Sequence, residues 1–281
     1  MDRLDLGDVE VLHLCGGRFR LDAGTMFGVV PRVLWEPLVA TDERHRLQLA
    51  CNCLLVRTAG ALTLVDTGIG ERWGPKEQDL LAIEPEAGLA GSLSRAGIGP
   101  EQIDRVVLTH LHFDHFSGCL RLDGDRLVPA FPAAEYLVQR GEWEDAVQGR
   151  SSMRTSYRRH ELEALAGNGR VRFLEGDADL GEAVSVFVTG GHTESHQGVV
   201  VRGSRETLLL PADLVSTRTH LRPYWNTSYD MFPYQSRQRK QELLAQAAEN
   251  DWVMGFNHDP EQPWARLRRA GDQYVADGAP A

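Results

Sequence analysis

Short apolar runs recur along the chain, many of them rich in valine and leucine and bounded by glycine, proline or aspartate. Runs of this length and composition are typical of β-strands buried on one or both faces. Gly16–Gly17 indicates a tight turn between the first two runs, and Ala59–Gly60 indicates a hairpin between the next two. The pattern predicts strands at residues 9–14, 18–21, 54–57, 61–65, 105–109, 171–174, 184–188, 199–202, 207–210 and 252–256.

Longer stretches repeat their apolar residues every three or four positions, which is the spacing of one face of a helix. The segment 26–31 is apolar but interrupted by Gly28 and Pro31, so it is predicted to be a loop. Helices are interspersed with strands and no linker divides the chain, so we expect a single domain over residues 1–281 with layered α/β or α+β packing. The helices are predicted at residues 85–96, 142–149, 157–166, 238–249 and 265–270.

Composition and charge narrow the classes of partner. Hydrophobic residues make up 42% and charged residues 25% of the 281 residues, which is ordinary for a globular protein, and the formal net charge is -10. A nucleic-acid partner or an anionic membrane is not expected, since either would favour a basic surface. The basic clusters 237–240 and 266–269 are interpreted as solvated helix faces. The N-terminus lacks a secretory signal and no apolar run is long enough to span a membrane, so we expect a cytoplasmic protein.

Four cysteines occur, at positions 15, 51, 53 and 119. Cys51 and Cys53 would lie on the same face of a strand, because side chains alternate along extended backbone. They could form half of a thiolate metal site, but no second pair completes it. The sequence therefore favours buried, reduced thiols.

One short segment concentrates side chains that can bind metal. His110, His112, Asp114 and His115 fall within six residues, directly after the predicted strand at 105–109. A lone histidine is usually a core or surface residue without chemistry. That explanation fails for this cluster, because burying several such groups without partners costs several kcal/mol. Imidazole and carboxylate ligands suit zinc, and also iron, manganese or cobalt.

Three later residues are candidates to complete one or two metal sites. His192, Asp213 and His258 each follow or end a strand-like run. Residues at strand ends on one edge of a sheet can meet in space although they are distant in sequence. We therefore expect these three side chains to converge on the first cluster.

The whole pattern resembles the metallo-β-lactamase superfamily. The resemblance rests on the HxHxDH motif at 110–115, on Gly191-His192, Asp213 and His258, and on Asp66-Thr67-Gly68 at the end of the early hairpin. It covers roughly residues 50–260 in matching order and spacing. It implies a four-layer αββα sandwich with two divalent metal ions, most simply zinc, at one edge.

The resemblance also implies a role for each residue. His110, His112 and His192 would bind the first metal ion. The second would be bound by Asp114, His115 and His258, and Asp213 would bridge both ions. Asp66 would orient a ligand histidine, the kind of partner that fixes an imidazole tautomer; the alternative is a plain turn residue.

Departures within the superfamily narrow the branch. Class B1 β-lactamases have arginine where His115 stands and cysteine where Asp213 stands, and the diiron flavoproteins have glutamate where His112 stands. The ligand set is instead similar to lactonases, glyoxalase II, ribonuclease Z and organophosphate hydrolases. The charge of -10 and the lack of an obvious arm for transfer RNA disfavour ribonuclease Z. Quorum-quenching lactonases commonly have tyrosine three positions after the bridging aspartate, whereas this chain has Ser216.

Aromatic and apolar residues in two loop-like stretches are candidates for the wall of a substrate pocket. The alternatives are ordinary packing or a subunit interface, and the lactonase-like branch also implies a homodimer. The pocket candidates are Met26, Phe27, Tyr224, Trp225 and Tyr229, and Trp35, Phe232 and Tyr234 belong to the same group. Tyr224 or Tyr229 could supply the phenol that Ser216 lacks.

The function expected from these features is hydrolysis of a small ester or lactone by a hydroxide that bridges two metal ions. A bound zinc ion lowers the pKa of water from about 16 to about 7, so such a nucleophile exists near neutral pH. Asp114 is the candidate to carry the proton to the leaving group. The alternatives are a phosphotriester hydrolase, a mononuclear iron thiol dioxygenase and a non-catalytic binding protein with a relict site.

Overall fold

The computed structural model describes residues 2–84, 88–151 and 153–277, which form two seven-stranded sheets and one short hairpin. In the first sheet the strands have the order β1 (Arg3–Asp5), β2 (Glu10–Asp22), β3 (Arg46–Arg57), β4 (Leu62–Val65), β5 (Arg105–Val107), β8 (Glu135–Gln139) and β9 (Val171–Leu174). In the second they have the order β10 (Ala178–Asp179), β11 (Val184–Val188), β12 (Gln197–Arg202), β13 (Thr207–Leu210), β14 (Val253–Gly255), β15 (Trp264–Ala270) and β16 (Gln273–Ala276). The separate hairpin pairs β6 (Leu120–Asp123) with β7 (Arg126–Pro129).

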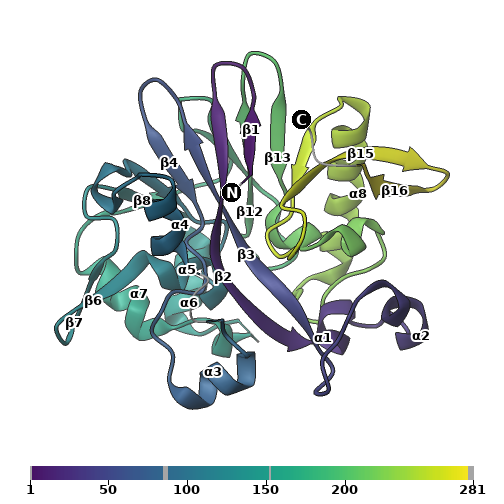
Figure 1. The fold of residues 1–281 in the computed structure, drawn as a ribbon, viewed down its shortest axis with the longest axis horizontal. Coiled ribbons are helices and arrows are strands. Elements are labelled where there is room, and N and C mark those ends of the chain that lie inside the picture. Colours follow the sequence, from purple (N-terminus) through teal and green to yellow (C-terminus); the bar gives the residue numbers. More distant parts are fainter. Residues whose placement is uncertain (1, 85–87, 152, 278–281) are drawn as a thin grey trace.

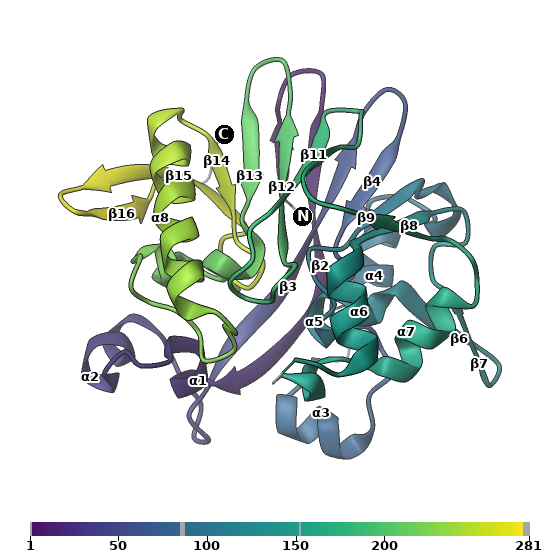
Figure 2. The same ribbon diagram turned by 180° about the vertical axis from the view of Figure 1, so that it is seen from behind.

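The helices lie outside the two sheets, so the molecule has four layers (Figures 1 and 2). On the side of the first sheet lie α4 (Leu89–Arg95), α6 (Arg140–Gln148) and α7 (Arg159–Ala166), and α8 (Pro233–Glu249) covers the second sheet. The shorter helices are α1 (Ala23–Phe27), α2 (Arg32–Trp35), α3 (Pro75–Leu81) and α5 (Phe113–Phe116). The 3-10 turns are η1 (Glu36–Leu38), η2 (Pro100–Gln102), η3 (Ser117–Cys119), η4 (Arg154–Ser156), η5 (Ala212–Val215) and η6 (Arg218–Leu221).

The alternation of side chains along the strands explains how the layers pack. In β3, Leu54 and Val56 enter the core between the two sheets, and Leu55 enters the core beneath α4, α6 and α7. In β5, Val107 enters the core between the two sheets, and Val106 enters the core beneath α4, α6 and α7. A strand buried on both faces needs apolar residues at every position, which accounts for the uninterrupted valine and leucine runs of the sequence.

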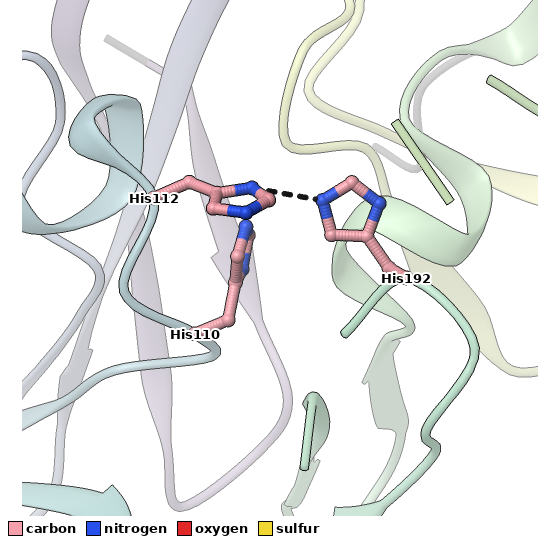
Figure 3. A group of neighbouring side chains, drawn as sticks. All are labelled: His110, His112 and His192. Atoms are coloured by element: carbon pink, nitrogen blue, oxygen red, sulfur yellow. Dashed lines mark hydrogen bonds between the residues drawn. The ribbon is translucent and has the colours of Figure 1, made fainter. Parts of the chain in front are cut away.

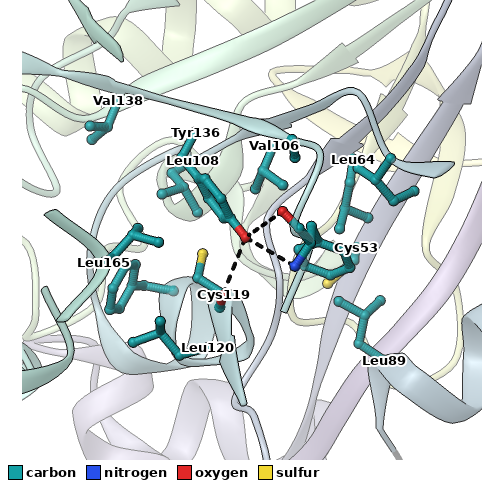
Figure 4. Close-up of a cluster of buried hydrophobic side chains, with 14 of the residues drawn as sticks. Cys53, Leu64, Leu89, Val106, Leu108, Cys119, Leu120, Tyr136, Val138 and Leu165 are labelled. Carbon is teal, nitrogen blue, oxygen red and sulfur yellow. Dashed lines mark hydrogen bonds between the residues drawn. The ribbon is translucent and has the colours of Figure 1, made fainter. Parts of the chain in front are cut away.

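The core beneath α4, α6 and α7 holds the hydroxyl of Tyr136, and that hydroxyl is hydrogen-bonded. Tyr136 from β8 is fully buried, and its hydroxyl accepts a hydrogen bond from the Phe131 N–H (3.1 Å) and donates to the Cys119 carbonyl (3.3 Å), as Figure 4 shows. Buried hydroxyls need such partners because an unpaired one costs free energy. These bonds join strand β8 to the segment that follows α5.

The predicted strands at 171–174, 184–188 and 207–210 are observed with the same bounds, and the hairpin at Ala59–Gly60 is confirmed as β3 and β4. Strand β8 lies between β5 and β9 in the first sheet but was not predicted. The predicted four-layer αββα fold is thus confirmed, although individual elements differ.

The predicted helix at 265–270 is wrong, because these residues form strand β15. Alanine, arginine and leucine favour helices, but the side chains alternate here: Trp264 enters the core between the sheets, while Ala265 and Leu267 face α8. Pairing with β14 on one side and β16 on the other fixes the extended form. The basic cluster 266–269 therefore lies on a strand and not on a helix.

Two further predictions near the N-terminus need correction. Gly16–Gly17 does not end a strand; it lies in an irregularity of the continuous strand β2, where the register shifts between Cys15 and Arg18. A Cβ added to Gly16 would lie 2.8 Å from the Gly68 Cα, so the glycine allows two backbones to approach closely. The segment 26–31 contains the end of α1 and not only loop.

The helix predicted at 85–96 is observed as α4, and residues 85–87 lie outside the described part of the chain.

Lys240 is an exception to the prediction that residues 237–240 form a solvated face. It is 1% exposed and its ammonium donates to the Trp225 carbonyl at 2.6 Å. Burial lowers the pKa of Lys240 to about 8, and the charge of Asp230 opposes this shift. The same charge of Lys240, added to burial, contributes to a pKa of about 4 for the nearby His220.

We expect Lys240→Met to remove a pH-dependent loss of stability. The folded-state pKa of about 8 lies below the ordinary value of 10.5, so the unfolded chain binds the proton more readily. The loss is therefore fully present below pH 8 and is relieved as pH rises from 8 to 10.5. Below pH 8 this pKa difference lowers the free energy of unfolding of the wild-type protein by roughly 3 kcal/mol. Lys240→Met should recover that amount, less about 1 kcal/mol because the variant loses the hydrogen bond to the Trp225 carbonyl. Urea unfolding of both proteins across this range measures it, and a difference that does not change with pH would contradict it.

The four cysteines are free thiols, as predicted. Cys51, Cys53 and Cys119 are buried and Cys15 is partly exposed. Burial raises the pKa of the Cys51 and Cys53 thiols well above the usual value, so they are poor metal ligands in this environment. Among the described residues, no helix has both the length and the hydropathy needed to cross a bilayer.

Candidate metal centre

The HxHxDH segment begins at the end of a central strand of the first sheet. Strands β4, β5 and β8 run parallel, and after β5 the backbone stays extended through His110 to His112, which caps the short helix α5. His110 and His112 therefore point to the same side, and the single turn of α5 brings Asp114 and His115 towards them. All four side chains are buried.

The second sheet contributes the three later residues. His192 follows β11, Asp213 lies in the 3-10 turn after β13, and His258 follows β14. Figure 3 shows His192 approaching His110 and His112 from a different part of the chain. Ala212, directly before Asp213, has a φ of 49°, a costly conformation for a residue with a Cβ. The site thus lies where the edges of the two sheets meet.

The predicted metal ligands converge on Asp213. Its carboxylate oxygens lie 3.0 Å from the His258 Nε2, 3.3 Å from the His192 Nε2 and 3.4 Å from the His115 Nε2. The His110 Nε2 lies 4.0 Å from the carboxylate, and the Asp114 carboxylate lies 3.6 Å from the His258 Nε2.

Within the described residues, three groups have ligand atoms that all lie within 4.8 Å of one another. They are His110, His112 and His192; His110, His115 and Asp213; and Asp114, His115 and His258. Ligands bound at about 2.1 Å to one tetrahedral zinc ion lie about 3.4 Å apart, which matches these separations. The first and the third group share no residue, so they could hold two separate ions.

The orientation of the rings shows that the centre needs positive charge. The Nδ1 of His115 donates to Asp66 (2.8 Å) and that of His258 donates to the Ala50 carbonyl (2.8 Å), because both partners only accept. In neutral rings both Nε2 atoms are then without protons, although they lie 3.0 Å apart. Two lone pairs face each other stably at this distance only with a cation or an added proton between them.

Unpaired atoms indicate the same need. The His110 Nε2, the His112 Nε2 and the Asp213 Oδ1 are buried without a hydrogen-bond partner. Native proteins seldom leave such atoms unpaired unless an ion or water satisfies them. Five imidazoles and two carboxylates are a donor set that suits zinc. The residues present therefore fit a pair of divalent ions.

Charge and burial divide the histidines into two sets. Burial and neighbouring histidines hold the pKa values of His110 and His112 well below the usual range. Burial also disfavours charge on His115, His192 and His258, but nearby aspartates, above all Asp213, raise their pKa values. The Asp213 pKa is held well below its usual range because the attraction of these histidines outweighs its burial.

Asp66 lies beside the centre, where it was expected to orient a histidine. One oxygen accepts from the Thr109 N–H at 2.8 Å, and the other accepts from the Thr109 hydroxyl, the His115 Nδ1 and the Asn257 amide. Since the Thr109 hydroxyl donates to Asp66, it accepts from the His110 Nδ1 (3.2 Å) and leaves the His110 Nε2 free. Asp66 thus directs two rings, one of them through Thr109.

Three residues that contact the centre or its chain segments were not predicted from the sequence. Asp230 accepts from the His192 Nδ1 at 2.9 Å and so points the Nε2 of that ring inwards. His196 accepts a hydrogen bond from the Asp213 N–H on its Nε2 (3.3 Å), and burial keeps its pKa far below the usual value. Glu142 contacts the segments around the histidines. His196 stands only four positions after His192, so its spacing was the one available indication.

A pocket with a free volume of about 60 Å³ opens onto the centre. Of the residues proposed from the sequence, Met26 and Tyr229 line it, whereas Phe27, Tyr224 and Trp225 do not. Phe27 is buried in a stack with Trp35, and Tyr224 is 61% exposed with the Arg237 guanidinium 3.9 Å above its ring. The full lining is Leu21, Met26, Leu49, His112, Phe113, Asp114, Ser156, His192, Asp213, Ser216, Thr227, Tyr229 and His258.

Comparisons with known proteins agree with this architecture. A family model described as the metallo-beta-lactamase superfamily matches residues 46–258. An N-acyl homoserine lactonase from Bacillus sp is 26% identical over 77% of this chain and 84% of its own length. One from Bacillus cereus is 29% identical over 58% of this chain, and the match spans 63% of that lactonase, less than two thirds of its length.

Solved structures extend the likeness to the whole chain. A protein from Staphylococcus aureus described as a probable metal-dependent hydrolase has a TM-score of 0.89 at 25% identity, covering 99% of this chain and 100% of its own. The dizinc quorum-quenching lactonase AidC shares the fold with a TM-score of 0.81 at 20% identity, covering 100% and 97%. These relatives and the family model agree with the enzyme class expected from the sequence, a metal-dependent hydrolase. The chain belongs to the metallo-β-lactamase superfamily, and the residues of its sequence motif lie together at the edge shared by the two sheets.

Proposed function

We propose that the protein is a dinuclear zinc hydrolase that opens a small lactone or cleaves a small ester. The observation that carries the proposal is the pair of histidine nitrogens, on His115 and His258, that face each other at 3.0 Å beside the carboxylate of Asp213. A protein interior holds such an arrangement only with a cation or an added proton between the nitrogens. The lactonase relatives support the choice of substrate class.

In this proposal His110, His112 and His192 would hold one ion, Asp114, His115 and His258 would hold the other, and Asp213 would be a ligand available to both. Bound together, the two ions would supply a water that is deprotonated near neutral pH and would polarise the electrophilic carbonyl. The presence of the second group, Asp114, His115 and His258, favours this proposal over a mononuclear iron dioxygenase, which needs only one site.

The protein's own residues then perform the remaining tasks. Asp114 lies on the pocket wall beside the His258 Nε2, so it can deliver a proton to the leaving oxygen. Leu21, Met26 and Leu49 form the apolar part of the wall, where the acyl portion of a substrate would lie. Tyr229, and not Tyr224, brings a phenol to this wall, and its hydroxyl is bonded to the Thr25 hydroxyl at 2.8 Å.

A substrate panel tests the proposal. The zinc-loaded protein is assayed with aliphatic lactones of increasing acyl length, aryl esters and phosphotriesters, and bound metal is counted by elemental analysis. We expect two ions per chain and the highest kcat/KM on lactones or esters. Preference for phosphotriesters would replace the proposed substrate class, and one iron per chain with oxygen consumption would overturn the reaction.

Removing the metal should reduce both activity and stability. Without cations the carboxylate of Asp213 and the lone pairs of the histidines are left uncompensated in the interior. Since metal binds the folded chain, zinc at 100 times its Kd adds about 2.7 kcal/mol per site. Chelator-treated protein is expected to lose hydrolysis and several degrees of Tm in calorimetry, and both should return with zinc. An unchanged Tm and full activity after verified removal would contradict this expectation.

A further inference from the structure

Glu142 is a buried carboxylate that the proposed chemistry leaves unexplained. It lies in the first turn of α6, is fully buried, and forms no ion pair with a described residue. Burying a carboxylate without a cation is costly unless hydrogen bonds satisfy it. Burial raises the pKa of Glu142, and its hydrogen bonds oppose that shift.

The hydrogen bonds of Glu142 reach both segments that carry the first group of histidines. Its Oε1 accepts from the Leu111 N–H at 3.0 Å, and Leu111 stands between His110 and His112. Its Oε2 accepts from the Thr193 hydroxyl at 2.5 Å, and Thr193 directly follows His192. One carboxylate therefore joins a segment that follows the first sheet to a segment that belongs to the second.

A third contact concerns the ring of His112. The Tyr157 hydroxyl donates to Glu142 Oε1 at 3.2 Å, and the Tyr157 ring packs against the His112 ring with 5.0 Å between centroids. Within the described residues, the His112 Nε2 has no hydrogen-bond partner, so on this side of the ring the packing against Tyr157 helps to orient it. His115 and His192 differ, because Asp66 and Asp230 bind their Nδ1 atoms directly.

We propose that Glu142 is a positioning residue that fixes the distance between His112 and His192 and so shapes the first metal site. The His112 Nδ1 and the His192 Nε2 face each other 3.1 Å apart (Figure 3), and Glu142 binds the two chain segments that carry these rings. The proposal rests on the proposed function only in taking these histidines as metal ligands. It concerns geometry and metal affinity, not the identity of the substrate.

The experiment is a metal titration of Glu142→Ala and Glu142→Gln, followed by cobalt absorption and by calorimetry with zinc. His112→Ala and His258→Ala mark which binding step belongs to which group. Removing a partner that orients ligands costs about 10–100-fold in metal affinity. We expect Glu142→Ala to weaken the step that His112→Ala removes by that factor, to alter the cobalt spectrum, and to leave the other step unchanged. Glu142→Gln keeps one acceptor and the size of the side chain, so its loss should be smaller.

Glu161→Gln is the matched control. Glu161 is equally buried and lies on α7 in the same layer, but it pairs with Arg72 and Arg158. Its variant should lose stability without losing either metal step. Thr193→Val replaces Glu142→Ala as the test if the latter does not fold. It removes a single donor to Glu142 and should reproduce part of the loss of metal affinity.

Two unweakened steps in Glu142→Ala, or equal weakening in Glu161→Gln, would overturn the role of Glu142. Failure of the proposed function has a different signature. A wild-type protein that binds two ions but hydrolyses no lactone or ester would refute that function and leave the result on Glu142 intact.

Discussion

Asp213→Ala is expected to abolish hydrolysis and to reduce bound metal to less than two ions per chain. The carboxylate lies within 3.4 Å of the Nε2 atoms of His115, His192 and His258, and its negative charge raises the pKa values of all three. Without it, five buried imidazoles must share two cations with a single acidic ligand, Asp114. A residue that only orients a ligand already contributes about 10–100-fold, so we expect a loss of about 10³-fold or more in kcat/KM.

Elemental analysis and steady-state assays measure these effects, with Asp145→Asn as the control. Asp145 is also buried, but it lies on α6 and pairs with Arg150 at 2.6 Å. The control should retain two ions and near-normal turnover. If Asp213→Ala bound two ions and hydrolysed its substrate normally, a bridging role for Asp213 would be untenable.

Asp114→Asn is expected to retain much of the metal and yet turn over far more slowly. Asparagine keeps the size of the side chain and one oxygen ligand, while the group that carries a proton is lost. Positioned acids and bases contribute about 10²–10⁴-fold, so kcat should fall within that range. Metal content measured on the same samples separates lost chemistry from a lost ion.

The leaving group provides an internal control for this variant. A phenolate that departs without protonation needs little help from an acid, whereas the alkoxide of an opened lactone needs a proton. Asp114→Asn should therefore lose much less activity on activated aryl esters than on aliphatic lactones. Equal losses on both, or undiminished turnover with full metal content, would remove Asp114 from proton transfer.

The sequence was sufficient to predict the location of the centre because local structure places the motif. His110, His112 and the turn that carries His115 follow a buried strand whose apolar run is unmistakable. The residues that support the motif were harder to find. Glu142 and Asp230 contact it across 31 and 38 positions of sequence, and neither stands in a pattern of its own.

Two errors have specific physical causes. Residues 265–270 have helical propensity, but pairing with β14 and β16 outweighs it, since propensities differ by less than about 1 kcal/mol per residue. Lys240 was assigned to a solvated face because of its charged neighbours. The helical spacing of three or four residues places Lys240 on the buried face of α8. That face consists of Ser236, Lys240, Leu243, Leu244 and Ala247.

The division of the centre between the two sheets has a consequence for synthesis. His110 and His112 are synthesised well before His192, and Asp114 and His115 are synthesised well before His258. Neither histidine group is complete in a nascent chain until residues of the second sheet have been translated. Both ions can therefore bind only late in biogenesis, after the two sheets have packed together, and a chain arrested before residue 258 would expose an incomplete edge lined by acidic and histidine side chains to chaperones.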